Sequence, residues 1–260
     1  MTYKYITYTV NDRIATITLN RPEKKNALNF GLISELKDAL SQSERSEAVK
    51  VIILKGNGDV FCAGADIEYL QQLQKNSDEE NLADSTHLKE LYKQIYLLEK
   101  VVIAQVNGHA IAGGCGLVSV CDFAYAAPEA NFGYSEVRIG FIPAIVMVFL
   151  IRKIGEARSK ELLISGTFIS ANEAKNFGLI NHVSASLDQL EIDVLAFANK
   201  LCLSNSQYSM KTTKLMIGEV QNMDLDTALD YASRKNAEAR ASEDCIKGIA
   251  NFLDKKKLNW

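Results

Sequence analysis

The chain has 260 residues, of which 47% are hydrophobic, enough to bury a sizeable core in one large domain. It carries 29 lysine and arginine residues against 32 aspartate and glutamate residues, so its formal net charge is −3. This composition excludes a disordered or fibrous chain, and without a global basic field we expect no nucleic-acid partner.

The first half of the chain alternates strand and helix patterns. Polar and apolar residues alternate over 4–19 around residues 11–12, which predicts a β-hairpin. A helical period of apolar residues follows over 30–48, and then a strand of the kind buried on both faces of a sheet over 49–56. The same strand-to-glycine pattern returns at 101–108. Strand, helix and strand in this order predict βαβ crossovers, an α/β fold and a partly parallel sheet.

The second half is expected to be mostly helical. Segment 76–84 is charged and poor in apolar residues, which predicts a mobile loop before that half begins. The apolar run 141–151 predicts a buried helix behind Pro143 and is too short to span a bilayer. We expect a core domain over 1–200 and a helical oligomerisation region over 201–260. The later predicted helices are 159–165, 171–177, 187–203, 209–219, 225–237 and 242–253.

The five cysteines are scattered along the chain and form no CxxC pair. Neither a disulfide framework nor a metal site is therefore expected. The first ten residues lack the apolar stretch of a signal peptide. We expect reduced thiols in a cytoplasmic protein that does not associate with a membrane.

Two glycine-containing loops each leave a buried strand and enter a helix, in "VIILKGNGDVFCAGADIEYL" from Val51 and "VIAQVNGHAIAGGCGLVSV" from Val102. Helix N-termini present unpaired N–H groups, and glycine lets a ligand approach the backbone. Two such ends that converge would bind a negatively charged oxygen. A nucleotide-phosphate site is a weaker interpretation because the GxGxxG and GxxxxGKS or GxxxxGKT patterns are missing. Glycines that only permit close helix packing remain the alternative.

Five segments form a set with a coherent order and spacing: "ITLNRPEKKNALN" (17–29), "FCAGADI" (61–67), "VNGHAIAGGCGL" (106–117), "CDFAYAAPEANFGYSEVRIGFIP" (121–143) and "GLINHV" (178–183). Together they resemble the enoyl-CoA hydratase/isomerase, or crotonase, family over essentially the whole chain. The resemblance implies a crotonase-like ββα spiral core with a helical C-terminal third. It also implies an acyl-CoA substrate, no cofactor beyond the coenzyme A of that substrate, and a homotrimer or dimer of trimers.

Matched residue by residue, the resemblance implies that the backbone N–H groups of Ala65 and Gly113 form an oxyanion hole for the thioester oxygen. Proton removal or addition next to a thioester places negative charge on that oxygen as an enolate. Each preorganised donor at such an oxygen is typically worth ~3–4 kcal/mol.

The resemblance also implies where coenzyme A binds. The adenine end and the pantetheine would lie along the first glycine loop and the turn before it. Lys24 as part of a solvated turn, and Asp66 as the N-cap of the helix that follows it, stay open as alternatives. The implied residues are Lys24, Ala27, Ala63, Ala65, Asp66 and Ile67, with Phe252 and Lys255 reaching the coenzyme A of a neighbouring subunit.

The acid–base residues are the feature in which this chain departs from related hydratases. The resemblance implies Glu136, in "NFGYSEVRIG", as the acid/base, but the second glutamate of hydratases is replaced by Gly116 in "GGCGL". One glutamate can move a proton between two carbons, as in an enoyl-CoA isomerase. The absence of the second glutamate should weaken water addition by about 10²–10⁴-fold unless another group substitutes for it. The candidates considered are His109, Tyr134, Ser119 and Glu68, with a structural role as the alternative for His109.

Three functions stay open. The first is an enzyme acting at C2–C3 of an acyl-CoA, in fatty-acid or branched-chain (methylglutaconyl-CoA) degradation. The second is a decarboxylase of a carboxyacyl-CoA, which would use the same oxyanion hole. The third is a non-enzymatic CoA-binding relative, which the retained Glu136 disfavours. Bulky residues at 145–149, where relatives have a glycine-rich segment, predict a short or branched acyl chain.

Overall fold

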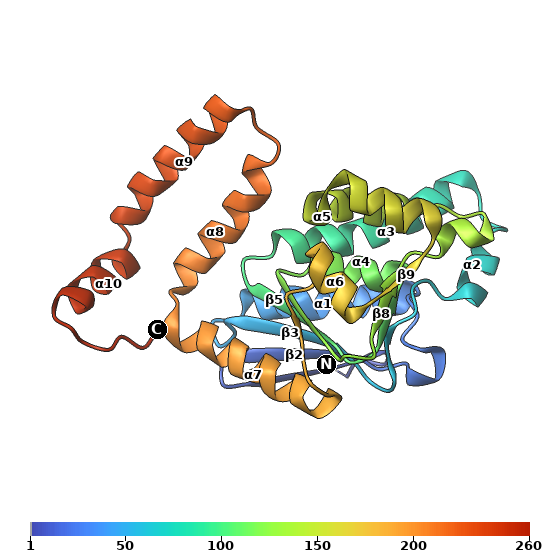
Figure 1. The fold of residues 1–260 in the computed structure, drawn as a ribbon, viewed down its shortest axis with the longest axis horizontal. Helices are drawn as coiled ribbons and strands as arrows, with labels where there is room; N and C mark the ends of the chain where they lie inside the picture. Colours follow the sequence, from blue (N-terminus) through green and yellow to red (C-terminus); the bar gives the residue numbers. More distant parts are fainter. Residues whose placement is uncertain (1) are drawn as a thin grey trace.

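The computed structural model describes residues 2–260 (Figure 1). In this part of the chain the strands form a six-stranded sheet, ordered β1-β2-β3-β5-β7-β10, and a four-stranded sheet, ordered β4-β6-β8-β9. Together with the helices that cover them, they confirm the predicted α/β fold. The strands of the larger sheet are β1 (Ile6–Asn11), β2 (Ile14–Leu19), β3 (Val51–Gly56), β5 (Val101–Val106), β7 (Phe123–Ala126) and β10 (His182–Val183).

The predicted hairpin is confirmed, but its turn lies one residue later than expected. β1 and β2 pair antiparallel with Asn11 opposite Ile14, so Asn11 stays in the strand. The turn residues are Asp12 and Arg13, whose φ angles of 48° and 68° are left-handed. A two-residue turn with both central residues in this conformation matches the right-handed twist of the flanking strands.

The rest of the larger sheet is parallel, as the strand–helix–strand pattern predicts. β2 pairs with β3, β3 with β5, β5 with β7 and β7 with β10, all parallel. Alternate residues of β3 face opposite layers because side chains alternate along a strand. Ile52 and Leu54 belong to the cluster that includes α1 and α3, while Val51 and Ile53 belong to the cluster that includes α7.

Helices cover both faces of the larger sheet, and α1 begins and ends at identifiable residues. The side chain of Asn29 accepts a hydrogen bond from the Leu32 N–H, which makes it the N-cap, and the backbone turns extended at Ser46. The helix predicted over 30–48 therefore ends three residues early. The helices are α1 (Phe30–Arg45), α2 (Ile67–Leu73), α3 (Asp78–Leu97), α4 (Gly113–Val120), α5 (Ala144–Ser165), α6 (Ala171–Phe177), α7 (Leu187–Ser204), α8 (Gln207–Val220), α9 (Leu225–Arg240) and α10 (Glu243–Leu253).

The prediction of a loop over 76–84 is wrong, because α3 begins at Asp78. Ser77 and Glu80 form a capping box in which each side chain accepts a hydrogen bond from the other residue's backbone N–H. Acidic residues in the first turn also interact favourably with the positive end of the helix dipole. The acidic residues of this segment, which favour a loop by composition, stand in the first turn of α3.

The smaller sheet brings the two glycine loops together. β4 (Val60–Cys62) and β6 (His109–Ile111) are parallel neighbours, with Cys62 paired to Ala110. Their carboxyl ends therefore lie side by side, and the loops leading into α2 and α4 start there. β8 (Asn131–Gly133) pairs with β6 on its other side, and β9 (Phe168–Ser170) completes the sheet.

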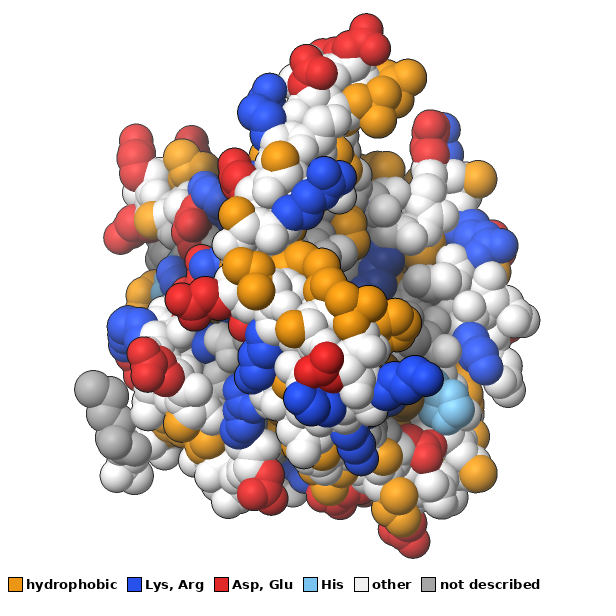
Figure 2. Space-filling view, turned by 90° about the vertical axis from the view of Figure 1, so that its left-hand side faces the viewer, with side chains coloured by type: hydrophobic (Ala, Val, Ile, Leu, Met, Phe, Trp, Pro, Cys, Tyr) orange, Lys and Arg blue, Asp and Glu red, His pale blue; other side chains and the backbone are white. Residues whose placement is uncertain are grey.

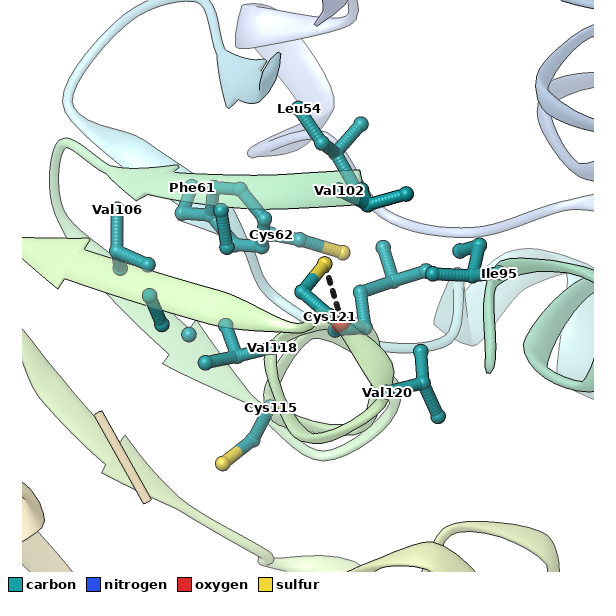
Figure 3. Packing of buried hydrophobic residues seen from close by; sticks show 14 of the residues in the cluster. Leu54, Phe61, Cys62, Ile95, Val102, Val106, Cys115, Val118, Val120 and Cys121 are labelled. Carbon is teal, nitrogen blue, oxygen red and sulfur yellow. Dashed lines mark hydrogen bonds between the residues drawn. The ribbon is translucent and has the colours of Figure 1, made fainter. Parts of the chain in front are cut away.

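Buried hydrophobic side chains pack against α4 to form the core at this point (Figure 3). Phe61 and Cys62 of β4 lie against the side of α4 that carries Val118, while Cys115 points to the other side of that helix. The Cys121 thiol donates to the carbonyl oxygen of Leu117 at 3.2 Å. All five cysteines, each within the described residues, are free thiols.

The helix predicted behind Pro143 forms as α5, but only one side of it is buried. Val146 and Leu150 are 4% and 0% exposed, whereas Val148 is 51% exposed. The backbone of α5 departs from helical geometry at Gly155. The expectation of a buried helix therefore holds for one face only, since an apolar helix at the edge of the core buries only the face that contacts α4.

The C-terminal helices project from the body of the molecule (Figure 1). The structure confirms the predicted helices of this region as α8, α9 and α10, and neither α9 nor α10 contains a buried residue. The expected domain boundary at residue 200 falls inside α7, whose Leu201 and Cys202 belong to the core cluster. Figure 2 shows hydrophobic side chains gathered on the face that these helices form.

Candidate active site

The first glycine loop is fixed by a short parallel bridge between Leu28 and Ala65. The Leu28 N–H donates to the carbonyl oxygen of Gly64 at 2.7 Å, and the Asp66 N–H donates to the carbonyl oxygen of Leu28 at 2.9 Å. In such a bridge the N–H of the central residue, Ala65, points away from the partner strand. Within residues 2–260 this N–H donates to no protein acceptor. It is therefore available to a ligand.

The second glycine loop presents the N–H of Gly113, the first residue of α4. The first N–H groups of a helix have no partner within the helix. The residue before it, Ala112, has φ 51° and ψ −123°, an uncommon conformation for a residue with a side chain, and its N–H donates to the carbonyl oxygen of Gly133 at 2.8 Å. Strain of this kind persists where surrounding contacts hold it. Sequence reasoning missed Ala112, because no local pattern predicts its conformation.

The two loops touch at Gly64. A Cβ on Gly64 would lie 2.7 Å from the Ala112 Cβ and 3.3 Å from the Gly113 nitrogen, and its φ is +92°. Only glycine fits both the conformation and the space. The structure thus brings Ala65 and Gly113, predicted from two separate loops, to one place, and this arrangement suits an oxygen that gains negative charge.

Glu136 comes three residues after β8 ends, and its carboxylate is near enough to the buried Tyr92 hydroxyl to help raise the pKa of that group. Glu136 begins a short 3-10 helix (Glu136–Ile139), and its Oε2 atom is buried with no hydrogen-bond partner among the described residues. Burial raises the pKa of Glu136 above the ordinary glutamate value, and a hydrogen bond from its own backbone opposes this in part. A carboxyl with a raised pKa and a free oxygen is suited to acid–base chemistry.

The place of the missing glutamate is filled by two other side chains. A Cβ on Gly116 would lie 2.4 Å from the Val146 Cγ1 atom and 3.0 Å from the Tyr92 hydroxyl oxygen. Tyr92 is fully buried, and its hydroxyl donates to the carbonyl oxygen of Gly113 at 2.8 Å. No feature of the sequence around Tyr92 distinguishes it from an ordinary core residue, so sequence reasoning missed it.

Three of the four residues considered as substitutes for the missing glutamate are engaged elsewhere. The Ser119 hydroxyl donates to the carbonyl oxygen of Gly116 at 2.7 Å, as side chains inside a helix often do. His109 is exposed and accepts a hydrogen bond from the Asn131 N–H at 3.2 Å, which supports the structural interpretation. Glu68 pairs with Lys24 at 2.7 Å. Tyr134, the fourth, is fully buried, and its hydroxyl has no hydrogen-bond partner within residues 2–260.

The predicted coenzyme A residues of the first loop lie together. Asp66 accepts from the N–H groups of Glu68 and Tyr69, so the N-cap interpretation is confirmed, and it pairs with Arg21 at 2.9 Å. Burial raises the pKa of Asp66, but the hydrogen bonds from Arg21 and the two N–H groups outweigh it and lower the pKa overall. Arg21, which sequence reasoning missed, also donates to the carbonyl oxygen of Ala27 at 2.6 Å and so ties the turn to the loop.

The remaining coenzyme A residues differ in exposure. Ala27 is buried, Ala63 is half-buried, and Ile67 is exposed at the start of α2. The Ala63 N–H donates to the carbonyl oxygen of Lys25 at 3.0 Å. The side chains of Lys24 and Glu68 are both exposed, in keeping with the interpretation of Lys24 as part of a solvated turn.

Phe252 and Lys255 are not brought to this site by their own chain. Phe252 lies on α10 and is 84% exposed, and α10 is at the opposite end of the molecule from α2 in Figure 1. A contact between these residues and coenzyme A would require a second copy of the chain.

The far end of α4 is held by Lys153. Its ammonium group donates to the carbonyl oxygens of Cys121 and Val118, at 2.7 Å and 3.4 Å. Burial lowers the pKa of Lys153. A cation at the C-terminal end of a helix complements the helix dipole. Both ends of α4 therefore have side-chain partners, Tyr92 at the first turn and Lys153 at the last.

A groove of about 730 Å³ lies between α8 and the core; its lining includes Ser119 and Phe149 but not Ala65, Gly113 or Glu136. Lys214 on its wall pairs with Asp122 at 2.8 Å and also donates to the carbonyl oxygens of Ile95 and Lys100. Within residues 2–260, no three His, Cys, Asp or Glu side chains gather as a metal site would need, and no helix has the length and apolar character needed to cross a membrane.

Comparisons of the sequence with known proteins identify the family of this chain. A sequence model of the enoyl-CoA hydratase/isomerase family matches residues 9–260. The crotonyl-CoA hydratase of Syntrophomonas wolfei subsp. wolfei is 34% identical over 262 residues, covering 100% of this chain and 99% of that protein. The short-chain-enoyl-CoA hydratase of Clostridium acetobutylicum is 34% identical, covering 95% of this chain and 93% of that protein.

The fold of this chain also matches solved structures of the same family. A solved enoyl-CoA hydratase structure from Mycobacterium smegmatis matches with a TM-score of 0.93 and 28% sequence identity, covering 99% of both chains. The chain is therefore an enzyme that belongs to the enoyl-CoA hydratase/isomerase family.

Proposed function

We propose that the protein moves a proton at C2–C3 of an enoyl-CoA thioester, with Glu136 as the acid/base. The observation that carries this proposal is the buried Oε2 atom of Glu136, which has no hydrogen-bond partner among the described residues. A buried polar atom without a partner is costly unless a ligand completes its environment. The relatives named as hydratases of crotonyl-CoA and short-chain enoyl-CoA support this choice of substrate class.

In the proposed mechanism the thioester oxygen lies between the N–H groups of Ala65 and Gly113. Negative charge that develops on this oxygen is stabilised by donors that are already oriented, at a helix end whose dipole favours an anion. Glu136 takes a proton as the enolate forms and returns it to carbon. Only proton transfers are needed, so coenzyme A would enter solely as part of the substrate.

The acyl pocket is proposed to accept a short or branched chain. Val146 occupies the space beside Gly116, and Phe149 packs edge-on against Tyr92 with ring centroids 6.3 Å apart. Val148 and Met147 are 51% and 41% exposed, so of the bulky residues in this segment these two contribute least to the interior.

A panel of thioesters tests the proposed function. The protein is incubated in D₂O with 2-enoyl-, 3-enoyl- and methylglutaconyl-type CoA esters, with a carboxyacyl-CoA to detect decarboxylation, and products are followed by mass. We expect turnover of 2-enoyl or 3-enoyl esters with deuterium incorporated at carbon, and the preferred ester distinguishes straight-chain from branched substrates. Decarboxylation alone would contradict the proposal, as would binding of all esters without any turnover.

The pH dependence of kcat/KM should show the raised pKa of Glu136. The carboxylate is the active form of the base, so activity is lost as the pH falls through this pKa. Because burial raises the pKa of Glu136 above 4.5, the acidic limb should lie above that value. The measurement is kcat/KM for the preferred ester from acidic to neutral pH. A profile that stays flat down to pH 4.5 would show that Glu136 is not the titrating base.

We also propose that the chain assembles as a homotrimer or dimer of trimers through its C-terminal helices. Exposed apolar residues lie on all three of them, including Ile217 at 57%, Leu225 at 73% and Ile249 at 57% exposed. An apolar surface of this kind on projecting helices commonly marks an interface. In such an assembly Phe252 and Lys255 would be free to contact the coenzyme A of a neighbour. Light scattering after size exclusion measures the oligomeric state.

A further inference from the structure

The space that a side chain at residue 116 would need is closed, and one of the two groups that close it is polar. Val146 offers a methyl group, 2.4 Å from a Cβ on Gly116, whereas Tyr92 offers its hydroxyl oxygen at 3.0 Å. The glutamate of related hydratases therefore cannot simply be restored here. The polar atom nearest to where that glutamate would start is the hydroxyl of Tyr92.

The Tyr92 hydroxyl is held in one orientation. Its single proton is donated to the carbonyl oxygen of Gly113 at 2.8 Å, and its ring packs against Phe149. A phenolic oxygen whose proton is committed in this way still has lone pairs that can accept a hydrogen bond. The group is thus an acceptor anchored to the same residue whose N–H is the proposed oxyanion donor.

Tyr92 also lies within the field of Glu136. Burial, followed by the nearby Cys62 thiol and the Glu136 carboxylate, raises the pKa of Tyr92 well above its ordinary value. The hydroxyl consequently stays protonated at any pH at which Glu136 changes charge. Of these two neighbours, Glu136 can exchange a proton, whereas Tyr92 can only accept a hydrogen bond.

We infer that the Tyr92 hydroxyl holds the water molecule that adds to C3 of a 2-enoyl-CoA, in place of the missing glutamate. This inference rests on the proposed function and specifies its reaction as hydration. One O–H of the water donates a hydrogen bond to the Tyr92 oxygen and stays intact. The other proton is transferred to the Glu136 carboxylate while the water oxygen bonds to C3. The π electrons of C2–C3 move to the thioester oxygen as an enolate. Protonated Glu136 then delivers its proton to C2, so the net change is addition of one water.

Tyr92→Phe tests this inference, because it keeps the ring and removes only the hydroxyl. Hydration of a 2-enoyl-CoA should lose at least about tenfold in kcat, as expected for one lost hydrogen bond to the reacting water. Isomerisation of a 3-enoyl-CoA, which needs Glu136 and the two N–H groups but no water, should fall by a clearly smaller factor than hydration, because only the bond to the Gly113 carbonyl is lost for that reaction. The ratio of the two rates is the readout, since a merely structural effect on α4 lowers both equally. If the variant isomerises at the normal rate, it is folded.

Tyr96→Phe is the matched control. It removes a hydroxyl one turn further along α3, where the contact is a 3.4 Å hydrogen bond from Gln221. Both rates of this control should match the wild type. Equal hydration by Tyr92→Phe and wild type would overturn the inference, and so would a parallel fall of both rates or a wild type that isomerises without hydrating. If Glu136→Gln leaves both reactions unchanged, the proposed function itself fails.

Discussion

Glu136→Gln is expected to lower kcat for proton transfer on enoyl-CoA by about 10²–10⁴-fold, the usual contribution of a positioned general acid–base group. The amide keeps the size of the side chain but cannot take a proton from water or from carbon. The coenzyme A residues of the first loop lie on other elements, so KM should change little. Steady-state rates of wild type and variant with the preferred ester measure the effect.

Glu129→Gln is the matched control for this substitution. Glu129 is an exposed carboxylate just before β8, on the same stretch of chain, and its replacement should leave kcat unchanged. A Glu136→Gln enzyme with more than a tenth of the wild-type kcat would contradict the assigned role.

The stability of Glu136→Gln separates loss of chemistry from loss of fold. A carboxyl whose pKa is raised in the folded state favours folding at low pH, and this contribution is lost as the pH rises through that pKa. The glutamine variant should therefore melt at or above the wild-type temperature at neutral pH, and the difference should shrink under acid conditions. A lower melting temperature at neutral pH would mean that Glu136 supports the fold.

Gly114→Ala is expected to cause the largest combined loss of stability and activity. A Cβ at this residue would lie 2.1 Å from the carbonyl oxygen of Cys62, so α4 and β4 must move apart. Overpacking of this kind costs about 3 kcal/mol when backbone atoms have to shift. The same movement separates the N–H of Gly113 from that of Ala65, and loss of one oxyanion donor costs about 10²–10³-fold in kcat. Denaturant unfolding and kcat are measured together.

Gly248→Ala is the corresponding control on α10. The nearest atom to its new Cβ is in the Trp260 ring at 3.4 Å, an ordinary contact. Alanine is also the better helix former by about 1 kcal/mol, so stability should stay the same or rise. If Gly114→Ala unfolds at the same denaturant concentration as wild type and keeps full activity, the two loops do not need this close approach.

Periodicity and strand–glycine patterns were enough to predict four strands of the larger sheet, β1, β2, β3 and β5, and the C-terminal helices, but not the short strands β7 and β10. They failed at 76–84 because the start of α3 depends on a reciprocal pair, Ser77 and Glu80, whose meaning lies in their spacing rather than their charge. The burial of α5 was overestimated because a sequence does not tell how many neighbours a helix has. Local sequence patterns thus predict where helices and strands form better than they predict which faces of those elements are buried.

The site residues also divide into those that a local motif identifies and those that only the fold identifies. Ala65, Gly113 and Glu136 belong to contiguous motifs and could be predicted by resemblance. Tyr92 and Arg21 could not, because their roles come from contacts with residues far along the chain, Tyr92 with Gly113 and Arg21 with Asp66. Their side chains become informative only when the fold brings those partners to them.

The most direct measurement is the infrared stretching frequency of the thioester carbonyl in a bound enoyl-CoA, isotope-labelled at that carbonyl and recorded as a difference spectrum. Two N–H donors at Ala65 and Gly113 would polarise the bond, so we predict a clear shift to lower frequency on binding to wild type. The shift should persist in Glu136→Gln, which leaves both donors in place. A carbonyl frequency equal to that of the free thioester in water, with binding shown in the same sample, would contradict the proposed oxyanion hole.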